Sequence, residues 1–345
     1  MIIGRPIPER ANVPPEEFRG EIYPAASPVI LRGFAADWPA VALAKTSDAA
    51  LIAHFKAHES GAPIEWLSGP PAIEGRFFYN DDMTGLNFTR RSGTLTQALD
   101  QIVAADGSAI HLQSTPTEGV LPGFASRNRI SFLPASVPAR IWIGNAITVQ
   151  THFDLSQNIA CVVAGRRRFT LFPPDQLANL YMGPIERTLA GTPVSLVQLT
   201  PDVEERFPRF REAMAHAFTG ELDPGDAIFI PYFWWHHVQS LAPFNVLVNY
   251  WWNEFGVLGS PMDTFLHAIL TLRDLPSAQK ATWKLVFDEF VFSGYPASTE
   301  HIPAHIRGGL GALDAATRAM LWNALAQGVN GFVASGSPFS KGPQG

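Results

Sequence analysis

The segment from about residue 109 to residue 252 constrains the fold most, because short apolar or alternating runs recur there between Pro, Gly and Asp residues. These runs are Ala109–Gln113, Arg140–Ile143, Asn158–Val163, Arg168–Phe172, Ala227–Ile230 and Asn245–Trp252. Runs of this length are typical of β-strands, and many short strands between turns indicate a sandwich or a barrel. We therefore expect a mainly β core, over residues 105–252, to which helices are added.

The segments on either side of the core have different patterns. Residues 1–104 mix strand-like pieces with helix-like ones, and we expect an α+β lead-in there. The strand-like pieces are Pro28–Arg32 and Arg76–Tyr79, and the helix-like ones are Asp48–His58 and Thr94–Ala104. In residues 253–345 the apolar residues follow a helical spacing, as in Thr264–Leu270 and Ala315–Ala326, which predicts a helical C-terminal region. Its tail, from Gly336, is rich in Gly, Ser and Pro, and we expect it to be mobile.

Composition narrows the classes of function. The chain has 345 residues, 46% of them hydrophobic, which is enough to bury a large core. Its 25 Lys and Arg residues face 31 Asp and Glu residues, a net charge of −6, so no overall basic field favours nucleic acid or an anionic membrane. The single cysteine, Cys161, excludes an internal disulfide, and no apolar run approaches the roughly 20 residues that span a bilayer. Because the N-terminus also lacks the pattern of a signal peptide, we expect a cytoplasmic protein without a membrane segment.

Two short stretches offer ligands for a metal. The first is Thr151–Asp154, with His152 and Asp154 two residues apart, and the second is Pro231–His237, in which His236 follows His152 by 84 residues. Residues i and i+2 of a β-strand share a face, so His152 and Asp154 can bind one ion. Two histidines and one carboxylate are the ligand set of an open, catalytic Fe(II) site. His237 competes with His236 as the third ligand, and the Trp-His pattern favours His236.

An ordered series of motifs surrounds these ligands. The series comprises Gln157-Asn158, Gly165, Leu171–Gln176, Glu205–Pro208, Trp234–His237 and Val248–Trp251, preceded by Pro28–Phe34 and Asp37–Pro39. With these motifs the chain resembles the Jumonji-C and cupin-like oxygenases, which use Fe(II) and 2-oxoglutarate. The resemblance covers roughly residues 109–252 and implies a double-stranded β-helix, the jelly-roll form of a cupin, with His152, Asp154 and His236 as metal ligands and catalytic residues.

The resemblance also implies a pocket for the cosubstrate. Arg167 falls where a member of the family has a lysine that binds the distal carboxylate of 2-oxoglutarate, and its guanidinium can bind a carboxylate with two hydrogen bonds. Alternation along a strand would place Arg167 inward and its neighbours in Arg166–Arg168 outward, although a surface cluster is an equal alternative. His111 stands in the place of a tyrosine that contacts the same cosubstrate.

The other positions of the cosubstrate pocket are less direct. Asn158 and Asn249 match asparagines that line the pocket, and for Asn249 a purely structural hydrogen-bonding role is an equal alternative. A threonine that precedes the first ligand by three residues is replaced by Val149. Thr148 or Thr151 can take its role, and Thr148 is favoured if the alignment has slipped by one residue.

The reaction implied is hydroxylation of an unactivated C–H bond with dioxygen, releasing succinate and carbon dioxide. Tyr79, Asn80 and Gln113 fall in regions that face the substrate in this family. The segment Pro184–Gln198 does not reproduce an Arg-Gln pair that contacts the substrate, so the preference for a particular substrate is not carried over. A side chain of a protein or peptide, or a small molecule, is expected. The helical C-terminal region resembles the part that this family uses to form homodimers.

Three alternatives stay open. The chain can be another cupin-type metalloenzyme, such as an isomerase or a dioxygenase without 2-oxoglutarate, and absence of Arg167 from the pocket would favour that reading. It can be a non-catalytic sensor that binds a metal or a ligand, because metal binding is not catalysis. It can also be an interaction module led by its C-terminal helices, which would take up no metal.

Overall fold

The computed structural model describes residues 4–104, 106–189, 191–200, 203–253, 259–293 and 297–334. The chain divides into two compact units, Met1–Glu254 and Phe255–Gly345. The predicted tail from Gly336 lies outside the described residues. In the described part, no helix combines the length and the apolar character that crossing a membrane requires.

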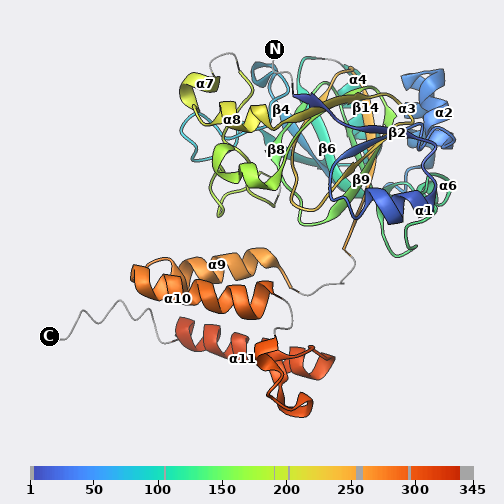
Figure 1. Ribbon diagram of the computed structural model, residues 1–345. Helices are drawn as coiled ribbons and strands as arrows, with labels where there is room; N and C mark the ends of the chain where they lie inside the picture. The colour runs from blue at the N-terminus through green and yellow to red at the C-terminus, as the bar shows by residue number, and fades with distance from the viewer. Residues whose placement is uncertain are drawn as a thin grey trace. The chain divides into compact units, whose positions relative to one another are not determined.

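Two β-sheets form the centre of the first unit (Figure 1). The smaller sheet has the strand order β1 (Arg5–Pro6), β11 (Phe218–Leu222), β10 (Arg167–Phe172), β13 (Trp235–Ser240) and β8 (Thr148–His152). The larger sheet has the order β2 (Glu9–Ala11), β3 (Val29–Arg32), β12 (Ala227–Ile230), β9 (Gln157–Ala164), β14 (Asn245–Trp252), β7 (Ala139–Gly144), β6 (Ala109–Pro116), β4 (Ile64–Gly69) and β5 (Thr89–Gly93).

The eight strands from β7 to β14 make a jelly roll. Four of them, β7, β14, β9 and β12, lie together in the larger sheet, and the other four, β8, β13, β10 and β11, lie together in the smaller one. The chain crosses repeatedly between the two sheets, which is the double-stranded β-helix expected from the sequence. The mainly β fold with added helices is therefore confirmed.

Two hydrophobic clusters pack against the larger sheet, one on each face. Between the sheets, Val162 of β9 packs with Phe169 of β10 and Ile228 of β12. On the outer face, Cys161 and Val163 of the same strand belong to a cluster that includes helical residues. A strand that is buried on both faces is a continuous apolar run rather than an alternating one, which explains the composition of residues 158–163.

Helices of the lead-in cover the outer face of the larger sheet. Their apolar residues, such as Val41, Leu51, Phe55 and Leu99, are buried in the same cluster as Val163. The helices of the first unit are α1 (Pro15–Glu17), α2 (Pro39–Thr46), α3 (Asp48–His58), α4 (Leu95–Ala104), α5 (Thr117–Val120), α6 (Phe124–Arg127), α7 (Val203–Arg206) and α8 (Phe210–Ala215). The predictions of helices near residues 48–58 and 94–104 are confirmed.

The strand predicted at Arg76–Tyr79 is wrong. Only two isolated bridges form there, from Arg76 to Thr148 and from Tyr79 to Leu86. Between them the side chain of Asn87 takes the place of a neighbouring strand: it accepts a hydrogen bond from the backbone N–H of Phe78 at 2.8 Å and donates one to the carbonyl of Arg76 at 3.0 Å. This strand-like piece thus belongs to a hairpin-like loop in which two backbone groups are hydrogen-bonded to a side chain.

The second unit is helical, as expected. It contains α9 (Pro261–Leu272), α10 (Ser277–Phe287) and α11 (Ala315–Ala334), with short helical turns between α10 and α11. Large apolar side chains stay exposed on these helices, among them Leu270, Trp283 and Met320.

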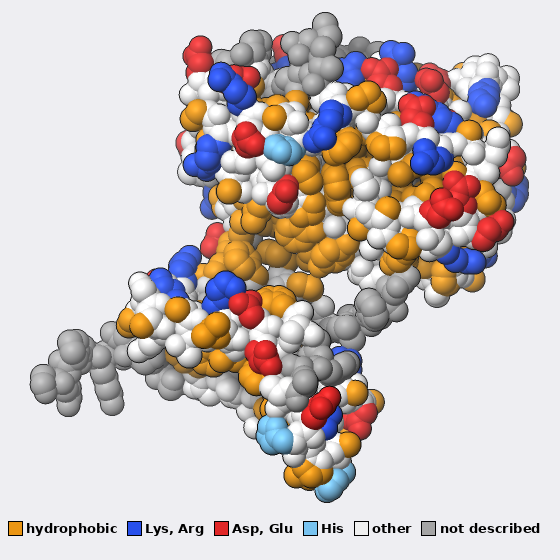
Figure 2. Space-filling model, viewed as in Figure 1, with side chains coloured by type: hydrophobic (Ala, Val, Ile, Leu, Met, Phe, Trp, Pro, Cys, Tyr) orange, Lys and Arg blue, Asp and Glu red, His pale blue; other side chains and the backbone are white. Residues whose placement is uncertain are grey.

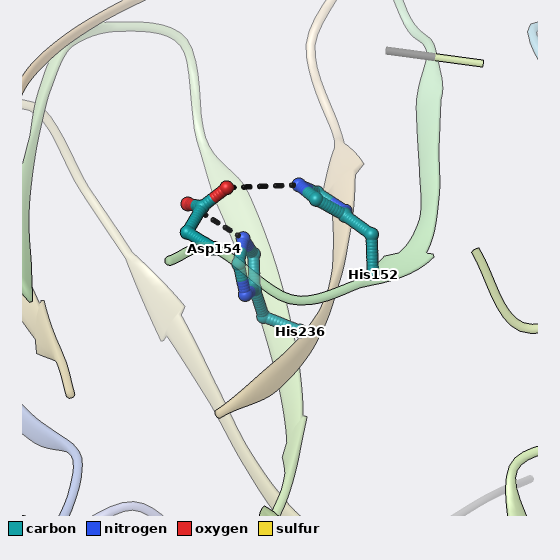
Figure 3. Close-up of side chains that lie close together, drawn as sticks. All are labelled: His152, Asp154 and His236. Carbon is teal, nitrogen blue, oxygen red and sulfur yellow. Dashed lines mark ion pairs between the residues drawn. The ribbon is translucent and has the colours of Figure 1, made fainter. Parts of the chain in front are cut away.

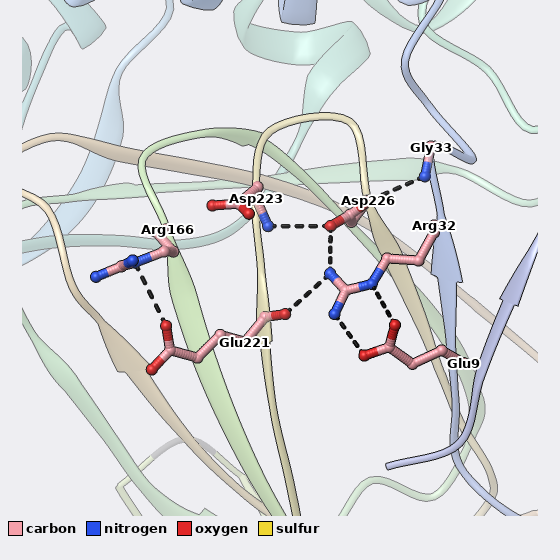
Figure 4. A network of polar contacts seen from close by, with 7 residues as sticks. All are labelled: Glu9, Arg32, Gly33, Arg166, Glu221, Asp223 and Asp226. Carbon is pink, nitrogen blue, oxygen red and sulfur yellow. Dashed lines mark hydrogen bonds and ion pairs between the residues drawn. The ribbon is translucent and has the colours of Figure 1, made fainter. Parts of the chain in front are cut away.

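A charged network joins the lead-in to the jelly roll (Figure 4). Arg32, at the end of β3, lies 2.6 Å from Glu9 Oε1 on β2 and 2.6 Å from Asp226 Oδ2, and it donates to the carbonyl of Glu221 at 3.0 Å. Asp226 also accepts from the backbone N–H of Gly33 at 2.9 Å. Because Asp226 immediately precedes β12, the network secures the turn from which the chain runs toward His236.

Replacing Arg32 by Gln should lower the free energy of unfolding by about 1–3 kcal/mol, because two carboxylates lose a charged hydrogen-bond donor. Urea denaturation at neutral pH measures the change. Arg32, through its hydrogen bond, holds the pKa of Glu9 below its usual range, so the contribution of Glu9 is present at neutral pH and is lost as the pH falls through that lowered pKa. The difference between wild type and variant should therefore narrow on acidification. Arg90→Gln, on the exposed strand β5, is the matched control, and equal losses in both variants would contradict the prediction.

Candidate metal centre

Three predicted ligands meet at the edge of the smaller sheet. His152 is the last residue of β8 and lies directly opposite His236 of β13 in the antiparallel ladder. Asp154 Oδ1 is 4.0 Å from Nε2 of His152, and Asp154 Oδ2 is 3.6 Å from Nε2 of His236 (Figure 3). The three ligand atoms lie within 4.8 Å of one another. This is a spacing that one ion can bridge.

Backbone carbonyls orient both imidazoles. Nδ1 of His152 lies 2.8 Å from the carbonyl of Gln150, and Nδ1 of His236 lies 3.0 Å from the carbonyl of Trp234. A carbonyl only accepts, so each Nδ1 carries the proton and each Nε2 presents a lone pair toward Asp154. Burial lowers the pKa of His236 to about 4, so His236 is neutral at physiological pH. The donor set fits a divalent metal such as Fe(II).

Asp154 lies just beyond β8 rather than on it, which corrects the expectation of a chelate carried by one strand. Strand alternation no longer orients its side chain there. Instead, Oδ2 accepts a hydrogen bond from Nε1 of Trp251 at 3.0 Å and a longer one from Nδ2 of Asn158 at 3.4 Å. The backbone carbonyl of Asp154 accepts from the N–H of Phe233 at 3.0 Å.

An aromatic stack connects the two segments that carry the ligands. Phe153, between His152 and Asp154, stacks on Phe233 with ring centroids 4.1 Å apart and meets Trp235 edge to face at 4.7 Å. Phe233 has a φ of 65°, a conformation that costs free energy for a residue other than glycine. The stack and the hydrogen bond to Asp154 offset that cost and keep the two loops together.

His236, and not His237, faces Asp154. His237 is also buried, but its Nδ1 lies 3.3 Å from Oγ1 of Thr151, and its Nε2 has no hydrogen-bond partner among the described residues. Burial lowers its pKa to about 4. The alternative ligand is therefore a packing residue behind the centre.

A pocket opens from the candidate metal centre into the jelly roll. Its walls follow strand alternation, with residues two apart on each strand sharing the inner face. They comprise Trp142, Val149, His152, Asp154, Asn158, Ala160, Arg167, Phe169, Ile230, His236, Val238, Leu247, Asn249 and Trp251.

Arg167 is the one arginine or lysine among the residues that line this pocket. It is 3% exposed, and its Nε has no hydrogen-bond partner among the described residues. Burial lowers its pKa to about 10, so it stays charged at neutral pH. Its neighbours Arg166 and Arg168 point outward, where both pair with Glu221, at 3.5 Å and 2.6 Å. A buried cation without an anion is costly, and a dicarboxylate such as 2-oxoglutarate fits the need.

Asn158 and Asn249 both line the pocket, and they are hydrogen-bonded to each other. Nδ2 of Asn249 donates to Oδ1 of Asn158 at 3.1 Å, and Oδ1 of Asn249 accepts from Nε1 of Trp142 at 2.7 Å. With the bond from Asn158 to Asp154, a relay of donors runs from Trp142 to the metal centre.

His111 and Thr148 lie elsewhere. Neither lines this pocket; both line a second cavity beside it, whereas Val149 lines both. His111 is 1% exposed and neither ring nitrogen has a partner among the described residues.

Of the three candidate substrate residues, only Gln113 lines the second cavity. Tyr79 is buried, and its hydroxyl donates to the carbonyl of Arg187 at 2.5 Å. Asn80 accepts from the backbone N–H of Gly85 at 2.9 Å within its own loop. Sequence reasoning assigned no role at the site to Trp142 or to Trp251. Trp251 could have been found because it lies two residues after Asn249 and so shares its face of the strand. Trp142 could have been found from the alternation of residues 140–143.

Comparisons with known proteins agree with this site. The model of the cupin-like domain family matches residues 15–256. HSPB1-associated protein 1 of Homo sapiens is 36% identical over 133 residues, 37% of this chain and 25% of that protein. Jumonji C domain-containing protein 5 of Drosophila melanogaster is 26% identical over 240 residues, 69% of this chain and 57% of that protein. Lysine-specific demethylase JMJ31 of Arabidopsis thaliana is 32% identical over 144 residues, 41% of this chain and 26% of that protein. These matches span from a quarter to somewhat more than half of the relatives' lengths.

Replacing Trp251 by Phe should weaken metal binding about 10- to 100-fold, because the carboxylate of Asp154 loses the donor that orients it. Calorimetric titration with Co(II) measures the affinity. Trp252→Phe is the matched control, since Trp252 packs against Phe18, Tyr23 and Phe229 instead. Equal affinity in Trp251→Phe and wild type would show that Asp154 is positioned without this hydrogen bond.

Proposed function

The chain belongs to the cupin-like domain family, and from that membership we propose that it is an Fe(II)- and 2-oxoglutarate-dependent oxygenase that hydroxylates an unactivated C–H bond. The observation that supports this most is Arg167, a buried cation without an anionic partner among the described residues, which lines the same pocket as His152, Asp154 and His236. A metal site alone would serve many reactions. A metal site with an unpaired guanidinium in the same pocket fits a ligand that has one end on the metal and a carboxylate at the other.

The protein's own part is to bind, orient and exclude water. His152, Asp154 and His236 would hold the iron, and Arg167 would bind the distal carboxylate of 2-oxoglutarate with two hydrogen bonds. Apolar residues such as Phe169 and Leu247 form the walls between them and keep water out. Bound iron would supply the activation of dioxygen. In the balanced reaction one oxygen atom enters the substrate as a hydroxyl, the other enters succinate, and 2-oxoglutarate loses carbon dioxide.

The alternatives predict different behaviour. A cupin-type isomerase, or a dioxygenase that does not use 2-oxoglutarate, would have no need of a buried arginine in this pocket, so the position of Arg167 counts against it. A ligand sensor would bind iron and 2-oxoglutarate without turnover. An interaction module would bind neither.

Removal of Asp154 should abolish turnover. In wild type, anaerobic addition of Fe(II) and then 2-oxoglutarate should produce a visible charge-transfer band, and admission of air should yield succinate. Asp154→Ala should lose both signals, because two imidazoles alone do not hold the iron. Asp263→Ala, at the start of α9, should behave as wild type. Undiminished succinate formation in Asp154→Ala would overturn the proposal, and a band without succinate from any tested substrate would favour the sensor.

The role of Arg167 has its own test. Arg167→Gln should weaken 2-oxoglutarate binding by roughly 30-fold or more, since a buried carboxylate loses its charged partner, while Co(II) affinity stays within about twofold. Arg167→Lys should fall between the two, because it restores the charge but not the two parallel hydrogen bonds. Titration of the charge-transfer band measures the affinity. Unchanged affinity in Arg167→Gln would remove this residue from the cosubstrate pocket.

The class of substrate is also a proposal. The name of the Arabidopsis relative assigns a lysyl substrate to that protein. For this chain, a protein or peptide side chain or a small molecule is proposed, in a cytoplasmic setting and without nucleic acid or membrane.

A homodimer through the C-terminal helices is proposed as well. The groove between α9 and α10 is apolar, with Phe265, Ile269 and Trp283 in its lining, and Figure 2 shows hydrophobic side chains at the surface of this unit. Exposed apolar surface of this kind marks interaction sites. Trp283→Glu should convert the dimer to a monomer in sedimentation experiments, and Thr282→Glu, its neighbour outside the groove lining, should not. A monomeric wild type would contradict the proposal.

A further inference from the structure

A second cavity lies beside the pocket of the metal centre. The two share Trp142, Val149 and the metal ligand His152. The relay of hydrogen bonds that ends on Asp154 holds Trp142 by its indole nitrogen. Trp142 and Val149 thus form a partition, and His152 places the second cavity within reach of the metal.

The second cavity is mainly apolar and contains no aspartate, glutamate, lysine or arginine among its lining residues. Leu67, Phe77, Phe88, Leu189 and Val194 are all less than 9% exposed. A charged group that entered this space would lose its hydration without meeting a countercharge among the lining residues, which costs several kcal/mol. An uncharged group would lose far less.

His111 provides the cavity with an unused hydrogen-bonding group. Both of its ring nitrogens are buried without a partner among the described residues, although one is a donor and the other an acceptor in the neutral ring. Burial, with the charge of Arg167 acting in the same direction, lowers its pKa to about 3, so the ring is neutral. Gln113 lies on the same strand two residues further on and also lines the cavity. A ligand with a complementary polar atom would satisfy this buried group.

Two loops that contribute lining residues to this cavity, Phe77 and Leu189, are hydrogen-bonded to each other. The hydroxyl of Tyr79 donates to the carbonyl of Arg187 at 2.5 Å, and the guanidinium of Arg187 donates to the carbonyl of Met83 at 3.0 Å. Nε2 of Gln150, another lining residue, donates to the carbonyls of Ser195 and Val197 at 2.7 and 2.8 Å. None of the residues that line the cavity is fully exposed, so it takes a group of limited size rather than an extended chain.

We propose that the second cavity receives the reacting group of the primary substrate, and that this group is uncharged and mainly apolar, with one polar atom that meets His111. This inference rests on the proposed function, which supplies the metal next to the cavity. It disfavours a lysyl ammonium and a carboxylate as the group that enters. The class of substrate is then a neutral side chain or a neutral small molecule.

Three probes of equal size and different charge test the proposal: cyclohexanol, cyclohexylammonium and cyclohexanecarboxylate. Each is titrated at pH 7 into the anaerobic protein with Fe(II) and 2-oxoglutarate, with calorimetry and the charge-transfer band as readouts. Cyclohexanol should bind and perturb the band, and the two charged probes should bind about 30-fold more weakly or worse, because burial penalises their charge. Equal or tighter binding of cyclohexylammonium would mean that the aromatic walls recognise a cation, and it would overturn the proposal.

Substitutions of lining residues test whether the probe binds in the cavity. Thr192→Trp, which introduces a bulky side chain at a lining residue, should abolish cyclohexanol binding and leave the band with 2-oxoglutarate intact. His111→Phe keeps the shape and should weaken cyclohexanol at least fivefold while methylcyclohexane binds as before. Leu177→Trp, on the exposed surface, is the control. Cyclohexanol binding that survives both variants, or an absence of binding to wild type, overturns the inference. Absence of the band itself is failure of the proposed function, and calorimetry without metal then still reports whether the cavity prefers the neutral probe.

Discussion

The pairing of β13 with β8 is the constraint on which the site depends. His236 lies opposite His152, and a slip of one residue along either strand would send a ligand to the opposite face of the sheet. The ladder is irregular just beyond this pair: Val238, two residues after His236, pairs with Val149, three residues before His152. The extra residue on β8 is a bulge, and it brings Val149 to the inner face together with His152.

That bulge explains why Thr148, which the sequence favoured over Thr151, does not line the pocket of the metal centre, whereas Val149 does. Alternation from His152 would place Thr148 on the inner face, but an extra residue in the strand shifts the order by one. Bulges leave no reliable mark in a single sequence. The strands themselves were well predicted, since runs such as residues 227–230 and 245–252 coincide with β12 and β14. For Arg167, alternation along β10 left an inward anchor and a surface cluster as equal alternatives, and the structure, in which this strand has no such irregularity, has Arg167 buried in the pocket.

Features that depend on contacts between distant segments could not be found in this way. Asp154 is oriented by Trp251, which lies 97 residues away. The loop at Arg76–Tyr79 has the pattern of a strand but satisfies its backbone through Asn87. The second cavity is formed by residues of separate segments, from Leu67 to Val194, and no single stretch of sequence predicts it. The local sequence pattern thus predicted the strands that form the walls of the barrel. The shape of the space inside could not be predicted, because it depends on tertiary packing.

The relay from Trp142 to Asp154 has a direction. An indole nitrogen only donates and a carboxylate only accepts, so the two ends decide how the amides of Asn249 and Asn158 must point. All three bonds are then aligned head to tail, with their positive ends toward Asp154, where they favour its negative charge. Aspartate has nearly the same shape as asparagine, yet at either position it would lack the N–H that donates to the next acceptor of the relay. At residue 158 it would also set two carboxylates against each other. Because the relay ends on a negatively charged metal ligand, residues 158 and 249 must each accept one hydrogen bond and donate another. Aspartate cannot do both, so it cannot replace either asparagine although its shape is nearly the same.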